Sequence, residues 1–376
     1  MTAWSWSIGP WRAGASAVAW LRTQGGPQRD LGTATARSLT IKLLEPSTAA
    51  VTVLGDSDEA LILEELITDV WVYRDHVPLF RGRMASESTD DNLDEQGVHR
   101  VTAKFVDYRG VLDRRLRYSD RTWTNVEQAT IVWDAISDAQ AALGGDLGLT
   151  QAPGWAATGV VRPSVIVKTG DYVGPFIATL ARMSNGFDWD IDTDLQVWLY
   201  YPKRGKDVGA GATLDWGGVV AQARRSFDPS KYAQAIRQSG ADGVAASTAS
   251  APDLATAPEG RWDAQFSDTN LTTADMVAQT ALSNLASASL PVPTYTLTLA
   301  AGAWGGPAHL WVGDYVQVVI KSGRLNEQSW ARVFELAISV DASDQESVTV
   351  TVGDVRMDPR SIIRGIMKRI DVLAKR

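Results

Sequence analysis

The sequence predicts a mainly β fold with α+β insertions, built from two β-barrel-like domains in one chain and a C-terminal helix. Apolar and polar residues alternate along residues 37–73, and a period of two is typical of half-buried strands. Further strand patterns follow up to residue 118 and again along 291–357. Helical spacing of apolar residues is found between and after these two stretches. The two stretches also share a sequence pattern, which indicates that one β domain occurs twice.

Changes of pattern divide the chain. Residues 85–97 are polar and acidic, as in a solvated loop, and residues 241–260 are rich in Ala, Ser, Thr and Pro, which is typical of a flexible loop. We therefore expect an N-terminal extension (1–36), a first β-barrel domain (37–118, completed by about 201–240), an α+β insertion (119–200), a flexible loop (241–260), a helical segment (261–290), a second β-barrel domain (291–357) and a C-terminal helix (358–376).

A capping-box pattern predicts the first helix. The side chain of Thr124 would accept a hydrogen bond from a free helix N–H, and Glu127 would reach back to the start of the helix. Apolar residues then follow at helical spacing until Gly144 and Gly145, which favour a helix end. We expect this helix to begin at Thr124.

Two further helices and a hairpin are predicted downstream. Residues 171–185 carry an apolar stripe that ends before Gly186. Residues 187–200 are typical of a β-hairpin that turns at 192–194. Residues 273–287 again have apolar residues on one helical face.

Two strands repeat one pattern of residues without gaps. In each copy an earlier strand begins with Asp, and a strand that contains an Arg lies between this earlier strand and the repeated one. The Arg is Arg83 in one copy and Arg332 in the other. Chance is an alternative, because β-rich segments share Val and Thr, but the matching order of elements favours duplication. A trimer of such a chain would present six similar units in a ring. The matching residues are Val101, Thr102, Asp107 and Arg109 in one strand and Val348, Thr349, Asp354 and Arg356 in the other.

The predicted C-terminal helix carries a seam of Ile363, Ile366, Ile370 and Leu373, spaced three, four and three residues apart. Ile at both a and d positions favours three or more strands in a coiled coil. The seam is therefore a candidate trimer or partner interface. The alternative is an amphipathic helix that packs on its own subunit, since two heptads are too few to hold a trimer alone.

Composition and motifs argue against an enzyme. The chain has no Cys, three His without zinc-binding spacing and a net charge of −8, so we expect no metal and no cofactor. No nucleophile elbow or phosphate-binding loop is present. An acidic chain is unsuited to gripping nucleic acid, and no stretch has the length of a membrane helix, so we expect no membrane anchor.

Four aspartates alternate along the predicted hairpin: Asp188, Asp190, Asp192 and Asp194. A solvated strand face with an Asp-rich turn is the first interpretation. The other interpretations open at this point are a metal site and, last, a pair of catalytic carboxylates. The EF-hand template fails, because its Gly and Glu positions hold Leu195 and Tyr201.

Seven segments between about residue 37 and residue 356 resemble those of a known protein family. The segments DVWVYRDHVPLFRGRM, VTAKFVDYRGVLDRRLRY, AALGGDLGL, GFDWDIDTDLQVWLYYPKRG, ALSNLASASLPVPTYTLTL, LWVGDYVQVVI and WARVFELAISV are similar to those of minor tail proteins of actinobacterial siphophages, which are related in fold to baseplate hubs. The order of these segments along the chain carries the resemblance.

The resemblance implies a structural role in the virion, at the tail tip of a siphovirus. It implies a homotrimeric ring below the distal tail protein, with contacts to the C-terminus of the tape-measure protein and to fibre or other minor tail proteins. It also implies a channel through which genomic DNA passes transiently during ejection, and a part in attachment to the host cell. Under this resemblance Asp188, Asp190, Asp192 and Asp194 would line the channel and repel DNA phosphates, an interpretation that ranks after the solvated face and before the metal site.

Three rival functions are considered. A carbohydrate- or receptor-binding tip protein predicts tryptophans clustered on an open face, whereas a hub predicts them buried; the Trp-rich N-terminus is expected to order against a neighbouring subunit. A cell-wall hydrolase would need a lytic domain, for which we expect no room after residue 357. A distal tail protein would form hexamers, and two barrels in one chain favour the trimer.

Overall fold

The mainly β fold is confirmed. Within the described residues, 14 strands form one sheet, accompanied by three smaller sheets. No helix in these residues is long and apolar enough to cross a membrane. The structure, a computed structural model, describes residues 3–10, 29–85, 89–155, 157–208, 213–229, 232–252, 254–255, 260–269, 271–289 and 293–353.

The large sheet contains two groups of strands, which we name the first and the second sheet unit. The first sheet unit consists of β1 (Trp4–Pro10), β2 (Arg29–Asp30), β3 (Ala36–Lys42), β4 (Thr48–Leu54), β5 (Thr68–Arg74), β6 (Val77–Arg83), β7 (Asp90–Leu93) and β8 (His99–Asp107), with a short helix η1 (Ala60–Ile62). The second sheet unit consists of β14 (Thr213–Asp215), β15 (Val220–Ser226), β19 (Thr294–Leu299), β20 (Tyr315–Ser322), β21 (Leu325–Asp341) and β22 (Glu346–Gly353).

The two sheet units pair their strands in the same way. In the first unit, β5, β6, β8, β4 and β3 are neighbours in that order, and in the second unit β20, β21, β22, β19 and β15 are neighbours in that order. All these pairings are antiparallel. Numbered along the chain, both units therefore follow one strand order.

The registers of the two units also agree. Thr52 lies opposite Thr102, and their hydroxyls are 3.0 Å apart. In the second unit Thr298 lies opposite Thr349, with the hydroxyls 3.3 Å apart. The repeated Val-Thr pair of the sequence thus occupies equivalent places on β8 and β22, whereas Asp354 and Arg356 lie outside the described residues.

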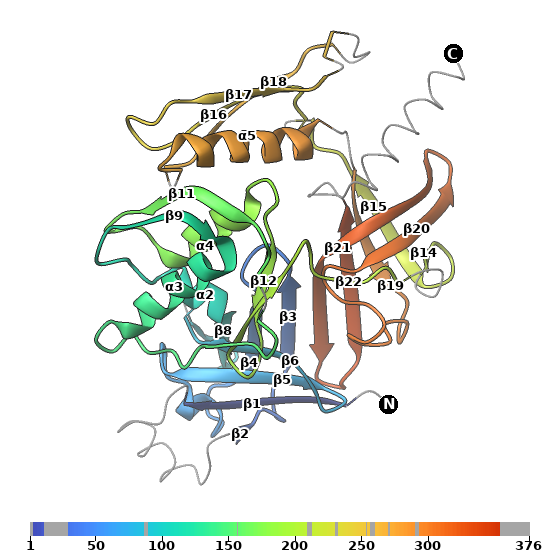
Figure 1. Cartoon of the computed structure of the whole chain (residues 1–376). Helices are drawn as coiled ribbons and strands as arrows, with labels where there is room; N and C mark the ends of the chain where they lie inside the picture. The colour runs from blue at the N-terminus through green and yellow to red at the C-terminus, as the bar shows by residue number, and fades with distance from the viewer. Residues whose placement is uncertain are drawn as a thin grey trace.

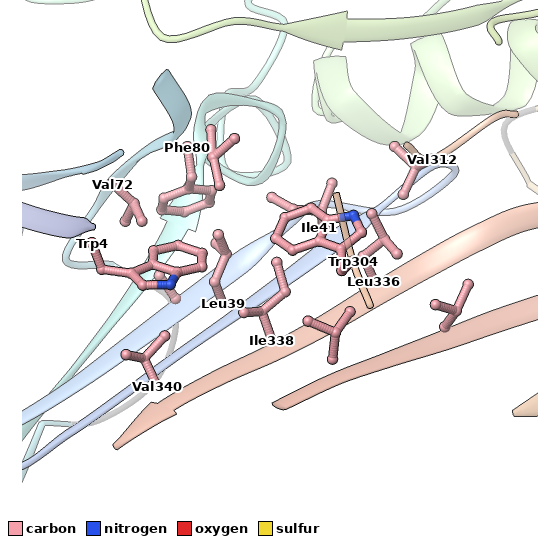
Figure 2. Close-up of a cluster of buried hydrophobic side chains, with 14 of the residues drawn as sticks. Trp4, Leu39, Ile41, Val72, Phe80, Trp304, Val312, Leu336, Ile338 and Val340 are labelled. Atoms are coloured by element: carbon pink, nitrogen blue, oxygen red, sulfur yellow. The ribbon is translucent and has the colours of Figure 1, made fainter. Parts of the chain in front are cut away.

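One strand pairing joins the two units into a continuous sheet. β3 pairs with the C-terminal half of β21, which places Leu39 opposite Ile338 and Ile41 opposite Leu336. These side chains lie in one hydrophobic core that spans both units, and Figure 2 shows them with Trp4 and Trp304. The two tryptophan rings stack with centroids 6.5 Å apart. The units therefore share a core as well as a hydrogen-bonded edge.

One expectation about how the first unit is completed is wrong. Residues 201–240 were expected to complete the first barrel, but β14 pairs with β20 and β15 pairs with β19, both in the second unit. The first unit is extended instead by β1, which pairs with β5 along its whole length. Trp6 and Ile8 of β1 are buried in the chain's own core, so this part of the N-terminus orders against its own subunit.

The insertion forms a layer beside β8 in Figure 1, and its buried residues belong to a second hydrophobic core. The predicted second helix and the predicted hairpin are both confirmed, as α4 and as the antiparallel pair of β12 and β13. The elements of this layer are α2 (Tyr108–Leu112), β9 (Arg121–Glu127), α3 (Gln128–Ala141), β10 (Thr150–Gln151), β11 (Val161–Val167), α4 (Val173–Arg182), β12 (Asp188–Ile191) and β13 (Gln196–Tyr200).

The predicted capping box is wrong. Thr124 lies inside strand β9, and the helix begins only after Glu127. Glu127 is itself the N-cap, because its carboxylate accepts hydrogen bonds from the N–H groups of Ala129 and Thr130, at 2.8 and 3.2 Å. Pairing with β11 holds β9 in an extended conformation through Thr124. This pairing outweighs the capping-box pattern of the local sequence.

A three-stranded sheet and the third predicted helix form the last layer. β16 (Ala235–Ser239) pairs with β17 (Ser247–Ser250) and β18 (Asp263–Ser267), and α5 (Ala274–Ala288) runs along this sheet in Figure 1. The expectation of a flexible loop over 241–260 is wrong where β17 forms, because Ala249 is buried against α5 and β16. The C-terminal helix and its Ile363, Ile366, Ile370 and Leu373 seam lie outside the described residues.

The shared core gives a stability prediction. We expect Leu39→Ala to lower the free energy of unfolding by about 2–5 kcal/mol, because it leaves a cavity at the pairing of β3 with β21. The control is Leu61→Ala, whose side chain is 74% exposed and whose loss should cost about 0.5 kcal/mol or less. Urea denaturation measures both; equal midpoints would show that this joint contributes no special stability.

Candidate functional site: an ion-paired junction

The hairpin of β12 and β13 is fixed to the second sheet unit by a buried ion pair. The Asp188 carboxylate pairs with the Arg332 guanidinium, and both side chains are 0% exposed. Asp188 also accepts a hydrogen bond from the backbone N–H of Arg204, at 2.7 Å. Arg332 donates to the carbonyl oxygens of Gly313 and Arg204, at 3.1 and 2.8 Å. A buried charge is tolerated only when it is paired and hydrogen-bonded in this way.

The repeated Arg of the first sheet unit has a similar environment. The Arg83 Nε atom lies 3.5 Å from the Asp69 carboxylate, and its Nη2 donates to the hydroxyl of Tyr108 at 3.0 Å. Burial raises the pKa of Asp69, against the opposing effect of Arg81 and the Tyr108 hydrogen bond. Each unit thus buries its repeated Arg, Arg83 on β6 or Arg332 on β21, beside a carboxylate. Only in the second unit does that carboxylate come from the insertion.

Asp190 lies at the centre of a second charged network. Its carboxylate is 2.5 Å from Nη1 of Arg204 and 3.7 Å from Nε of Arg109. Arg109 also donates to Asp107, at 3.0 Å, and to the Lys42 carbonyl, at 2.8 Å. Burial opposes the charge on Arg109, but Asp107 and Asp190 together raise its pKa. The Asp107 and Arg109 pair of the repeat therefore joins the end of β8 to the end of β3.

The remaining two aspartates have different surroundings. The Asp192 carboxylate accepts hydrogen bonds from the N–H groups of Asp194 and Gln196, both at 2.9 Å, and from the Trp198 indole at 2.7 Å. It therefore shapes the hairpin turn. Asp194 is exposed.

The four aspartates do not form one acidic face, which corrects the sequence-based interpretation. Asp188 is neither solvated nor able to line a channel, because its carboxylate is buried against Arg332. Asp188 and Asp190 are each paired with an arginine, so they are not arranged as a catalytic acid and base. In the described part of the chain, no group of three His, Cys, Asp or Glu side chains could hold a metal ion. No pattern in the sequence indicates Arg204 as a partner of Asp190.

The end of α2 brings another carboxyl group into a crowded place. A Cβ atom at Gly174 of α4 would lie 2.0 Å from Oδ1 of Asp113, so only glycine allows this approach. Burial, together with the negative charge of Asp107, raises the pKa of Asp113 to about 6, against the opposing effect of Arg109. Ionising Asp113 therefore costs stability in the folded chain.

The buried ion pair gives the second prediction. We expect Asp188→Ala to lower the free energy of unfolding by about 3–5 kcal/mol, because Arg332 keeps its buried charge without a carboxylate. The double variant Asp188→Leu/Arg332→Met should recover part of this loss, since both charges are gone. Asp194→Ala, at the exposed end of the same hairpin, is the matched control. Equal urea midpoints for Asp188→Ala and Asp194→Ala would contradict the assigned role.

Asp113 gives a prediction about pH. The folded pKa of about 6 exceeds the usual 3.8, so the stability penalty is absent below about pH 4 and complete above about pH 7. We expect Asp113→Asn to unfold at higher urea than the parent at about pH 7.5, by about 1 kcal/mol after allowance for partial exposure. The gain should vanish at about pH 4. A gain of equal size at both pH values would show another cause.

The comparisons with known proteins concern the fold. The sequence matches no protein-family model and no curated protein. Among solved structures, the tail protein from Neisseria meningitidis MC58 is similar, with a TM-score of 0.60 and 10% identity over 94% of this chain and 97% of that one. The 43 kDa tail protein of prophage MuSo2 from Shewanella oneidensis has a TM-score of 0.60 and 13% identity over 93% of this chain and 97% of that one.

A third similar structure is a prophage tail protein from Listeria monocytogenes EGD-e, with a TM-score of 0.56 and 10% identity. It matches 98% of this chain and 99% of its own length. These likenesses in fold extend over nearly whole chains, at sequence identities of 10–13%. The chain has the fold of phage tail proteins.

Proposed function

We propose that the chain is a structural hub subunit at the tail tip of a long-tailed bacteriophage of the siphovirus type. Three copies would form a ring of six sheet units, a pseudo-sixfold arrangement built on threefold symmetry. The observation that carries the proposal is the presence in one chain of two sheet units with the same strand order, joined through β3 and β21.

The ring would lie between the distal tail protein and the tip and fibre proteins, and it would surround the channel through which genomic DNA leaves. The C-terminus of the tape-measure protein would contact its inner side. The net charge of −8 suits a channel wall that does not hold DNA phosphates. Asp188 is not part of such a wall, and the exposed Asp194 stays a candidate.

A carbohydrate- or receptor-binding tip protein is the alternative from another class. It requires tryptophans that share an open face. Of the tryptophans in the described segments, Trp216 and Trp262 are exposed, at 45% and 48%. Trp216 lies at a bridge to β15 of the large sheet, whereas Trp262 precedes β18 of the three-stranded sheet. Their separation between two sheets favours the hub.

The mass of the purified chain in solution tests the proposal. We expect light scattering to give three chain masses, because the two sheet units of each chain supply two-sixths of a closed ring. Six chain masses would favour a distal tail protein instead. A single chain mass that persists at high concentration, together with a positive glycan-binding screen, would overturn the hub in favour of the sugar-binding alternative.

A further inference from the structure

The joint between the two sheet units shows how a unit presents an edge to a neighbour. The C-terminal half of β21 pairs with β22 on one side and with β3 on the other. Within this joint Ile338 lies opposite Val348 of β22 and opposite Leu39 of β3. β22 belongs to the same unit as β21, whereas β3 belongs to the other unit. The edge of β21 that pairs with β3 is therefore the edge that joins the two units.

β7 is the equivalent of this half of β21 in the first sheet unit. Asp91 of β7 lies opposite Val101 of β8, just as Ile338 lies opposite Val348, and Val101 and Val348 are equivalent positions of the repeat. β7 pairs with β8 on one side, and its four residues are exposed. In the described part of the chain, no strand occupies its other edge.

β15 is in turn the equivalent of β3. Ala36 of β3 lies opposite Thr52, and Gln222 of β15 lies opposite Thr298, where Thr52 and Thr298 are the equivalent threonines. β15 ends the path of the large sheet, and most of its residues are exposed. The described chain thus has one open edge that corresponds to β21 of the internal joint, on β7, and one that corresponds to β3, on β15.

We propose that β7 of one copy pairs antiparallel with β15 of a second copy of this chain. The register follows from the joint within the chain. Because Ile338 lies opposite Leu39 and Val340 opposite Arg37, the equivalent pairs are Asp91 with Arg225 and Leu93 with Ala223. The inference rests on the proposed hub function, and it names the surface by which one subunit holds the next.

The charges on the two edges are complementary. β7 carries Asp90 and Asp91, and β15 carries Arg224 and Arg225, so the proposed register places Asp91 opposite Arg225. The ion pair of Asp90 with Lys104, at 3.2 Å, and the contact of Asp91 with the His99 ring, at 3.7 Å, are on the surface and contribute little. Charged edges also resist unwanted pairing with other chains before assembly.

The side chain of Leu93 supplies the apolar part of the contact. It is 69% exposed in the single chain, and it would lie across from the half-buried Ala223. The joint is heterologous, since a β7 edge meets a β15 edge, and repeated joints of this kind form a closed ring when the rotation closes. With one joint inside each chain and one between chains, six units alternate around the ring.

Disulfide trapping tests the register, because the native chain has no Cys. We expect Leu93→Cys/Ala223→Cys to give covalent trimers on mild oxidation, since directly opposite residues have the Cα separation that a disulfide needs. The matched control is Leu93→Cys/Ser226→Cys, which shifts one partner by about 10 Å along the strand. We expect this control and both single-Cys variants to stay unlinked.

Charge reversal provides a second readout that needs no oxidation. We expect Asp91→Arg to weaken self-association by about tenfold, because two arginines would face each other across the joint. Arg225→Asp should have the same effect, and Asp91→Arg/Arg225→Asp should restore association. Asp242→Arg, which changes an exposed acid in the loop between β16 and β17, should leave it unchanged.

Two results would overturn the edge pairing, and they differ in their consequence for the hub. A trimer by light scattering that does not form the Leu93–Ala223 cross-link, or forms the shifted one equally well, contradicts the pairing and leaves the hub standing. A parent chain that remains single at high concentration contradicts the pairing, and together with a positive glycan-binding screen it contradicts the hub as well. Equal loss of association in the double charge variant and the single ones would also exclude the Asp91–Arg225 contact.

Discussion

The antiparallel pairing of β3 with β21 is the contact on which the rest of this structure depends. It joins two sheet units of the same strand order into one sheet, and it aligns Leu39 and Ile41 with Ile338 and Leu336 over a common core. Without this pairing the chain would be two small sheets that each expose an edge and an apolar face. The pairing also fixes the orientation of one unit relative to the other, and a ring would repeat this orientation.

Buried arginines hold the insertion to this sheet. Arg332 fixes the hairpin of the insertion through Asp188, and Arg109 joins the same hairpin to β3 through Asp190 and the Lys42 carbonyl. Such pairs add little net stability compared with apolar packing, but breaking one of them leaves an unpaired buried charge. Their effect is to specify where the insertion lies on the sheet, and the acidic hairpin is therefore a connector between layers.

The sequence predicted the features that depend on near neighbours. Alternating residues located most strands of both units, and apolar stripes located α4 and α5. The errors involve distant partners: β15 pairs with a strand about seventy residues later, and Asp188 meets Arg332 across 144 positions. The capping-box signal at Thr124 was likewise overruled by strand pairing. Hydrophobic periodicity and capping patterns carry no information on partners so far apart in the sequence. The ion-paired junction of Asp188 and Arg332 could therefore not be predicted as a site.

The central claim is that two equivalent sheet units in each chain build a six-unit ring around a channel. Cryo-electron microscopy of assembled tail tips that contain this protein tests it most directly. We expect threefold symmetry, with six sheet units related by approximate sixfold rotation and continuous strand pairing from each unit to the next. A ring in which each chain contributes a single unit, or in which neighbouring units touch without an extended sheet, would contradict the account.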